Sequence, residues 1–413
     1  MIVPKLNHFV SVNRRTASTF AVMALLGLLP ALASAQNVSV PAYIETMSPF
    51  EIRALDGQYA PTNGNVSMDS VTPQEWLNND PSVLGLNGVL AAWSGGAKST
   101  GTQLFVHGGG HADSANNGLY IYDFSGAANP TGWQSPLVIS SISDVRADNA
   151  EYADGRPNSV HTYDGIVHAS HNDHVYRFGG SPYISGGFTN SAFKYNVATG
   201  KWTRLADFPG WESAAKTIYD PVTGKLFVTM TGVFRGYFFR TDTDTWSAEK
   251  GYGGNGFPFD SMAAWDSRRN RAIIVGEGET STVAIDFVNE TVTVTSFNPS
   301  GATEIYGQSG VSAAYDPVRD VYWIFGGGIG SPGWNAVYQL RAGGSPWQTT
   351  RHAFTGSNVP LSKGLIGSWG RFAIMPQWGA IGFTAHESSP AFVLKLSDEQ
   401  FMIPMPPEDL IVD

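Results

Sequence analysis

Five side chains in one part of the chain have the types and the spacing needed for proton transfer on a charged substrate. His107 and His111 flank three glycines, and His161, Tyr163 and Arg177 follow downstream. An imidazole with an ordinary pKa of about 6.5 can accept a proton near neutral pH. A phenol can donate a proton, and a guanidinium can neutralise a negative charge. This set therefore predicts a site for acid–base chemistry.

The stretch with the first two histidines is expected to form the end of one strand, a loop and the next strand. Residues 104–124 hold an apolar run, then Gly108, Gly109 and Gly110, then a polar loop and an alternating run ending at Asp123 and Phe124. Strand, glycine stop, polar loop and strand is the structure that this order predicts. No helical pattern follows the glycines, so a phosphate-binding loop is not expected.

A two-strand unit of the same kind recurs along the chain. An apolar run, a turn such as Asp-Pro-x-x-Gly and a second apolar run ending in glycine are followed by a third strand and a tryptophan. Copies begin at His161, Tyr219, Trp265 and Tyr315, with looser versions at residues 87–110 and 369–384. A period of about 50 residues with four strands per unit is typical of a propeller.

The fold class predicted is therefore all-β, a β-propeller of six or seven four-stranded blades. Two segments decide the number of blades and the closure of the ring. Residues 137–158 are spare between two units and are a candidate for a degenerate seventh blade. Residues 38–55 are a candidate for an additional strand that closes the ring. Long helices are not expected, because no segment sustains an apolar stripe of period 3.6.

The units resemble kelch repeats, with glycine pairs at Gly179-Gly180 and Gly326-Gly327 and tyrosine and tryptophan positions after them. The resemblance covers nearly all of the chain after the first 35 residues and implies an architecture but no function. It also implies that the loop after a second strand and the loop into an innermost strand open on one face. The loop after a second strand would carry His111. His161 and Tyr163 would lie on the same face, at the start of the next innermost strand.

The first 35 residues have the features of a secretory signal peptide. Lys5, Arg14 and Arg15 precede an apolar core, which the small residues Ala33-Ser34-Ala35 follow. A basic segment, an apolar core and a small-x-small site define such a peptide. We therefore expect cleavage near Ala35, a secreted or periplasmic protein, and a single propeller domain over residues 36–413.

The composition excludes several partners and cofactors. Removal of the first 35 residues leaves 22 Lys and Arg against 35 Asp and Glu, a charge near −13, so nucleic acid and membrane are not expected as partners. The chain has no cysteine, which excludes disulfides and cysteine-bound zinc. His107 and His111 could ligate zinc or manganese, but the spacing reveals no third ligand, so no cofactor is expected. We expect a monomer.

Aromatic and polar side chains in the loops of the same face are expected to bind substrate. Ring faces cover the apolar face of a pyranose, and polar groups bind its hydroxyls. The candidates for substrate binding are His107, Asn117, Trp211, Arg235, Tyr237, Tyr306, Trp334 and Trp369. The expected partner is therefore a polysaccharide or an oligosaccharide.

Among propellers, the chain is similar in architecture and residue types to lyases that cleave ulvan and related rhamnose-glucuronate polysaccharides. That resemblance implies β-elimination on a uronate-containing glycan. The reaction needs a group that neutralises the carboxylate, a base for the C5 proton and an acid for the leaving oxygen. His111 or His161 would be the base, Tyr163 the acid, and Arg177 or Arg235 the cation.

Two other functions suit the same face. One is a non-catalytic kelch propeller that binds a glycan or a protein, and the other is a sugar isomerase similar to sialate epimerases. Copper chemistry of the galactose-oxidase kind is excluded, because the cofactor of that family requires a cysteine and the chain has none.

Overall fold

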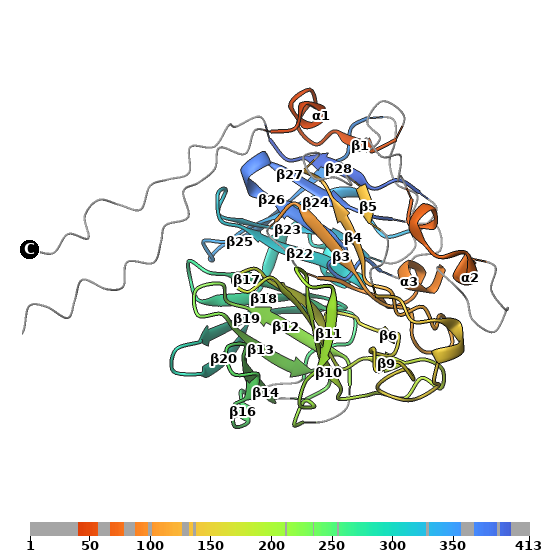
Figure 1. Ribbon diagram of the computed structural model, residues 1–413. Coiled ribbons are helices and arrows are strands. Elements are labelled where there is room, and N and C mark those ends of the chain that lie inside the picture. The colour runs from red at the N-terminus through yellow and green to blue at the C-terminus, as the bar shows by residue number, and fades with distance from the viewer. Residues whose placement is uncertain are drawn as a thin grey trace, which may run out of the picture. The chain divides into compact units, whose positions relative to one another are not determined.

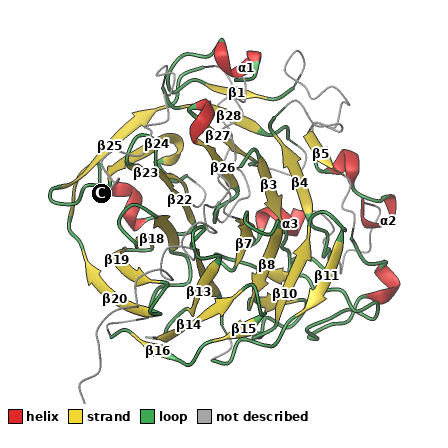
Figure 2. Cartoon of the chain, turned by 60° about the vertical axis from the view of Figure 1, so that its left-hand side comes forward, coloured by secondary structure: helices red, strands yellow, loops and turns green. Residues whose placement is uncertain are grey.

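Six antiparallel sheets surround a common centre and form a β-propeller (Figure 2). The computed structural model describes residues 40–56, 67–77, 87–97, 101–125, 132–134, 138–210, 213–233, 235–253, 256–327, 330–356, 367–385 and 389–397. All of them belong to one unit, which begins at Val40. Figure 1 labels the strands and helices of this unit. The predicted signal segment, residues 1–35, lies outside the described residues.

Each sheet is one blade, and four blades consist of strands in sequence order from the innermost to the outermost. Blade 1 contains β2 (Gly96–Ala97), β3 (Gln103–Val106), β4 (Tyr120–Asp123) and β5 (Gly132–Gln134). Blade 2 contains β7 (Ile166–Ala169), β8 (His174–Phe178), β10 (Ala192–Asn196) and β11 (Lys201–Arg204). Blade 3 contains β12 (Ala215–Tyr219), β13 (Lys225–Met230), β14 (Arg235–Arg240) and β15 (Thr245–Trp246), and β16 (Lys250–Gly251) also pairs with β14. Blade 4 contains β17 (Met262–Asp266), β18 (Arg271–Gly276), β19 (Glu279–Asp286) and β20 (Thr291–Ser296).

The last two blades each include a strand from elsewhere in the chain. Blade 5 contains β22 (Val311–Asp316), β23 (Val321–Gly326), β24 (Gly333–Arg341) and β25 (Trp347–Ala353), and β21 (Pro299–Gly301) runs parallel to β25. Blade 6 contains β26 (Phe372–Met375), β27 (Ala380–Phe383) and β28 (Phe392–Lys395), with β1 (Ile52–Ala54) as its outermost strand. A small separate sheet pairs β6 (Val160–His161) with β9 (Ser181–Pro182).

The helical segments are short. They are α1 (Ala42–Glu45), α2 (Gln74–Leu77), α3 (Asn87–Ala91) and the 3-10 turns η2 (Asp69–Val71), η3 (Ile142–Asp144), η4 (Glu304–Gly307) and η5 (Pro376–Trp378). Among the described residues, no helix has the length and apolar character needed to cross a membrane.

Strand β1 closes the ring, as the sequence predicted for residues 38–55. It pairs antiparallel with β28, with Arg53 opposite Val393. The Lys395 Nζ atom also donates a hydrogen bond of 2.6 Å to the carbonyl oxygen of Met47. The first described strand and the last therefore share one blade.

The described residues form six blades, and the spare segment before Asn158 does not add a seventh. It contains η3 and a series of turns, and its described part runs from Val138. Asn117 holds the segment in place, because the Asn117 Nδ2 atom donates to the Ser140 Oγ atom and to the Pro157 carbonyl, each at 2.9 Å. The segment is a loop fixed to blade 1 by side-chain hydrogen bonds.

The turns between first and second strands are shaped by an aspartate at the end of the inner strand. The Asp220 carboxylate accepts the N–H groups of Val222 and Thr223 at 3.3 and 3.0 Å. Asp266 and Asp316 do the same for their own turns. An aspartate that binds backbone N–H groups two and three residues ahead stabilises a tight turn, so the recurring Asp predicted these hairpins correctly.

Burial falls from the middle of a blade to its outer edge. Every residue of β23 is buried, since the blades on either side cover both faces of the sheet. The outer strand β20 has only exposed and half-buried residues, which alternate over its first four positions. This arrangement explains continuous apolar runs in middle strands and alternating patterns in edge strands.

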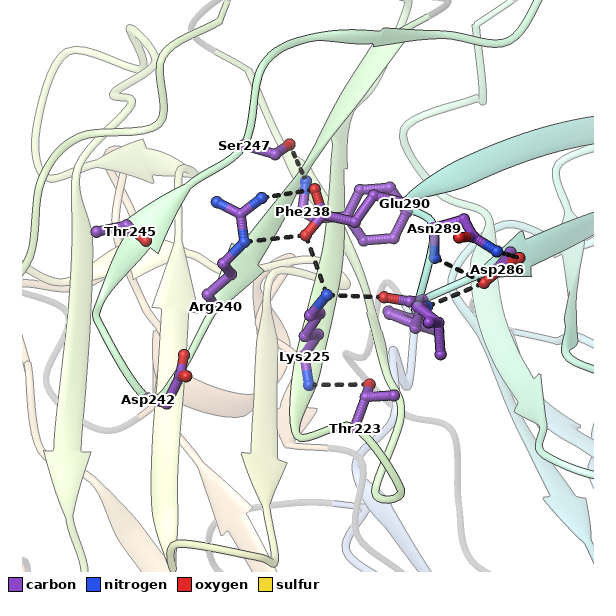
Figure 3. Close-up of polar contacts among 12 residues, drawn as sticks. Thr223, Lys225, Phe238, Arg240, Asp242, Thr245, Ser247, Asp286, Asn289 and Glu290 are labelled. Carbon is purple, nitrogen blue, oxygen red and sulfur yellow. Dashed lines mark hydrogen bonds and ion pairs between the residues drawn. The ribbon is translucent and has the colours of Figure 1, made fainter. Parts of the chain in front are cut away.

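Ion pairs join neighbouring blades, and blades 3 and 4 show this most fully (Figure 3). Glu290 lies in the turn between β19 and β20 and accepts hydrogen bonds of 2.9 and 2.7 Å from the Arg240 guanidinium of blade 3. The Lys225 Nζ atom lies 3.1 Å from Glu290 and 2.8 Å from the Phe287 carbonyl. Burial alone would raise the pKa of Glu290, but these hydrogen bonds outweigh it and hold the pKa below its usual value.

Candidate functional site

Backbone hydrogen bonds join each blade to the next at one end of the ring, through the loops that enter the innermost strands and the residues that follow some of the second strands. The acceptor carbonyls lie on entering loops, and each accepts an N–H group from a neighbouring blade; they belong to Trp93, Ser213, Phe257, Asp260, Gly310 and Trp369. Because each of these bonds links two neighbouring blades, the entering loops and their donors form one closed circle. Side chains that stand on this circle are held in fixed relative positions.

The turn after the three glycines places His111 and Asp113 beside this circle. The N–H groups of Asp113 and Ser114 donate to the Gly110 carbonyl at 3.0 and 3.2 Å, which makes the turn compact. Gly110 has a φ of +71°, and a Cβ atom there would lie 2.4 Å from the backbone nitrogen of His161. Only glycine allows this approach, so the glycine brings the turn against β6.

A hydrogen-bonded pair and a second imidazole form the centre of the candidate site. The His161 Nε2 atom lies 2.6 Å from the Asp113 Oδ2 atom. The ring of His111 stands edge-on to that of His161, with 5.5 Å between the centroids. We name His111, Asp113 and His161 the imidazole cluster.

The two imidazoles differ in their exposure. The His161 side chain is 3% exposed, whereas the Asp113 side chain is 32% exposed and His111 is half-buried. Burial lowers the pKa of His161, and the nearby Asp113 carboxylate opposes that effect. His111 is therefore the imidazole that a molecule in solution can reach.

Aromatic rings lie beside the cluster. The ring centroids of Trp93 and Tyr163 lie 5.1 and 6.0 Å from that of His161. The Tyr163 centroid in turn lies 6.1 Å from those of Phe259 and Trp369. These rings come from the entering loops of four different blades.

Tyr163 occupies a constrained position. Its φ is +47°, and its N–H group donates to the Trp93 carbonyl at 2.9 Å. Burial raises the pKa of its phenol, and the carboxylates of Asp260 and Asp113 raise it further. The sequence predicted that His161 and Tyr163 would begin the innermost strand, but β7 begins at Ile166, and both residues precede it.

Asp260, on the entering loop of blade 4, is an acid whose pKa is raised well above its ordinary value. Burial raises its pKa to about 6, and the neighbouring Glu277 carboxylate adds to the rise, while Lys216 opposes it. Its Oδ1 atom is buried without a hydrogen-bond partner among the described residues. Asp260 can therefore exchange a proton in mildly acidic solution.

Arg177 does not join the cluster. It is fully buried in β8, where its Nη1 atom donates to the Ser191 Oγ atom at 2.9 Å and to the Gly179 carbonyl at 3.0 Å. Its guanidinium lies over the ring of Phe193, and burial lowers its pKa to about 9, with the Arg204 charge contributing. These contacts are made within blade 2.

The other predicted binding residues are mostly inside the blades. His107, Asn117, Tyr306, Trp334 and Trp369 are all buried. Burial lowers the pKa of His107 to about 3, and its Nδ1 atom lies 3.3 Å from the Gly118 carbonyl. Of these five residues, Trp369 alone has a ring contact with Tyr163 among the described residues.

Arg235 and Tyr237 lie together at the edge of blade 3. The Glu249 carboxylate lies 3.1 Å from an Arg235 nitrogen and accepts from the Tyr237 hydroxyl at 2.9 Å. Trp211 lies outside the described residues. The predicted binding residues therefore do not form one surface around the imidazole cluster.

Sequence reasoning did not identify two residues of this region, Asp113 and Trp93. The signal for Asp113 was the His-x-Asp spacing in a tight polar loop, which puts both side chains on one turn. Trp93 had no comparable local signal, because its contact with His161 joins loops of different blades. Phe259 and Asp260 shortly precede β17, so the apolar run that follows them was the signal for their place in an entering loop.

A cavity of about 140 Å³ occupies the channel between the innermost strands, and none of its lining residues belongs to the imidazole cluster. Tyr219, Trp265 and Tyr315 line it at equivalent positions, each directly before the turn aspartate. The cavity is mainly apolar and does not contain the predicted acid–base groups.

Comparison of the chain with protein-family models found no match, and comparison with curated proteins found none either. The six-bladed propeller is therefore established by the structure alone.

Proposed function

We propose that this protein cleaves a uronate-containing glycan by β-elimination at the face that carries the imidazole cluster. The observation that carries the proposal is the meeting of His111, His161 and Tyr163 beside the half-buried ring of Trp93 and the exposed ring of Phe259. A base, an acid and flat apolar surfaces are what a sugar-cleaving site of this kind needs. The resemblance of the sequence to propeller lyases points in the same direction.

In the proposed reaction, His111 removes the C5 proton, because it is the reachable imidazole. The C5–H electron pair moves towards the uronate carboxylate and then forms the C4–C5 double bond as the C4–O bond breaks. Tyr163 gives its proton to the leaving oxygen and later recovers one from His111 through solvent. One glycosidic bond is broken, and no water is consumed.

His161 acts as a positioning residue in this scheme. Its Nε2 atom is engaged by Asp113, and its ring borders both His111 and Tyr163. Arg177 and Arg235 make their contacts elsewhere, so neither neutralises the substrate carboxylate. We assign the contact with the carboxylate to Asp260, whose protonated form predominates below its pKa of about 6 and can donate a hydrogen bond there.

The test is a panel of uronate glycans, such as ulvan, alginate, pectate and glucuronan, with the ultraviolet absorbance of the unsaturated product as readout. His111→Ala should lower the rate on the order of 10²- to 10⁴-fold, the usual contribution of a general base. Tyr163→Phe should also lower it. His174→Ala is the matched control, since His174 begins β8 at the turn on the opposite side of the blade.

A second candidate function applies if none of the uronate glycans yields an unsaturated product. A non-catalytic glycan-binding propeller is favoured by one observation, the burial of Arg177, which removes the expected cation from the face. Retained glycan binding without product would overturn the lyase proposal and support this alternative. Product formation that His111→Ala leaves unchanged would remove His111 from the mechanism.

A further inference from the structure

The imidazole cluster has the composition of a metal site. The potential ligand atoms of His111, Asp113 and His161 all lie within 4.8 Å of one another. Among the described residues, no other group of three or more His, Asp or Glu side chains comes this close together. Two of the three residues share one tight turn, and the third lies on β6 against it.

The donor set indicates which ion would be bound. Imidazole nitrogens favour zinc, copper, iron and nickel, whereas magnesium and calcium favour oxygen ligands alone. Zinc binds nitrogen and oxygen ligands at about 2.0–2.2 Å, so the ligand atoms of a tetrahedral site lie roughly 3.4 Å apart. The His161–Asp113 pair at 2.6 Å would open by less than ~1 Å as the ion replaces the shared proton.

Access to the cluster is one-sided. His161 is buried, while the Asp113 side chain is 32% exposed and His111 is half-buried. An ion from solution would therefore meet Asp113 and His111 first and keep an open position for water or another ligand. Gly186 packs against the ring of His111, where a Cβ atom would lie 2.1 Å from Nε2, and so limits the movement of that ring.

We infer that His111, Asp113 and His161 bind one divalent first-row transition metal ion, with Zn²⁺ the best-matched, and that the bound ion blocks the base. The inhibition of the base by the ion rests on the proposed function, whereas the binding of the ion to the cluster does not. A nitrogen lone pair that coordinates a metal cannot accept a proton. Metal binding and proton abstraction by His111 therefore exclude each other.

The binding is tested on the full chain after dialysis against a chelator, by calorimetric titration with Zn²⁺ alone. One site per chain is expected, with no heat from Mg²⁺ or Ca²⁺. Asp113→Asn and His111→Ala each remove a direct ligand and should weaken Zn²⁺ binding by at least the roughly 10- to 100-fold that loss of an outer-shell partner costs. Asp173→Asn is the matched control, because Asp173 pairs with the His168 Nε2 atom at 2.9 Å and belongs to no such cluster.

Unchanged Zn²⁺ affinity in Asp113→Asn and His111→Ala would overturn the site, provided that circular dichroism shows both variants folded. Asp113→Asn keeps the shape of the side chain, so a fold defect in His111→Ala alone leaves the test intact. With a glycan substrate, chelator-treated protein should be active and Zn²⁺ should inhibit it over its own binding range. Loss of activity on chelation would overturn the exclusion and make the ion a cofactor. Without any substrate, the titration still decides the metal site.

Discussion

Burial separates the roles of residues that look equivalent in the sequence. His111 and His161 are both histidines near the same loop, but one is half-buried and the other has a side chain only 3% exposed. Arg177 is completely enclosed, although its residue type suggested a binding group. At this scale the contacts of each side chain decide whether it can meet a substrate.

The raised pKa of Asp260 predicts how stability depends on pH. The folded value is about 6 against an ordinary value of 3.8, because burial and Glu277 disfavour the carboxylate. The folded state therefore binds the proton more tightly, and this contribution to stability is lost as pH rises from near 4 to about 6. Asp260→Asn should raise the melting temperature at neutral pH and have little effect below pH 4.

The melting temperatures of the parent protein and of Asp260→Asn are measured by thermal unfolding from about pH 4 to neutral pH. An equal melting temperature of the variant and the parent protein at neutral pH would show that the Asp260 carboxylate is not destabilised by its surroundings.

Glu290 should matter more to stability than an exposed acid with a similar partner. Glu290→Gln weakens a contact to both Arg240 and Lys225 at a side chain that is 11% exposed, and should cost about 1–3 kcal/mol. Glu249→Gln is the control, since the Glu249 side chain is 45% exposed and pairs with Arg235. Denaturant unfolding should show a clear loss for the first variant and a negligible one for the second. An equal loss of unfolding free energy in Glu290→Gln and Glu249→Gln would show that the burial of Glu290 does not increase its contribution to stability.

At the scale of strands and loops, the hairpins could be predicted and the meeting of loops could not. The turn aspartates Asp220, Asp266 and Asp316 act within a few residues of themselves, so local sequence was sufficient. The contact between Trp93 and His161 joins two blades, and no local pattern encodes it.

The burial of Arg177 in a strand also depends on neighbouring parts of the fold that local sequence does not encode. Its place two residues before a glycine pair correctly predicted the end of a second strand. Second strands are covered on both faces by neighbouring blades, and every residue of β8 after His174 is buried. A residue near the end of such a strand can therefore be enclosed, and Arg177 is, with its guanidinium over Phe193 and beside Ser191.

At the scale of the whole propeller, closure depends on the pairing of β1 with β28. Ile52 is 2% exposed and lies opposite Leu394 in this pair. Ile52→Asp should destabilise the protein by about 3–5 kcal/mol, because it removes apolar burial and introduces a buried charge. Val222→Asp, at a turn residue that is 84% exposed, should change little. The two melting temperatures are compared, and a stable Ile52→Asp variant would show that the closing strand is dispensable.

The same closure affects how the loops of the site face can vary. Lys395 and Met47 meet across 348 residues of chain, and no disulfide holds them, so the ring is a very long loop closed by non-covalent contacts. The entropy cost of closing a flexible loop grows only with the logarithm of its length, by about 0.6 kcal/mol for each doubling. A few residues added to an entering loop would therefore leave the cost of ring closure almost unchanged. The propeller can therefore alter the shape and chemistry of its loop face while the blades beneath stay the same.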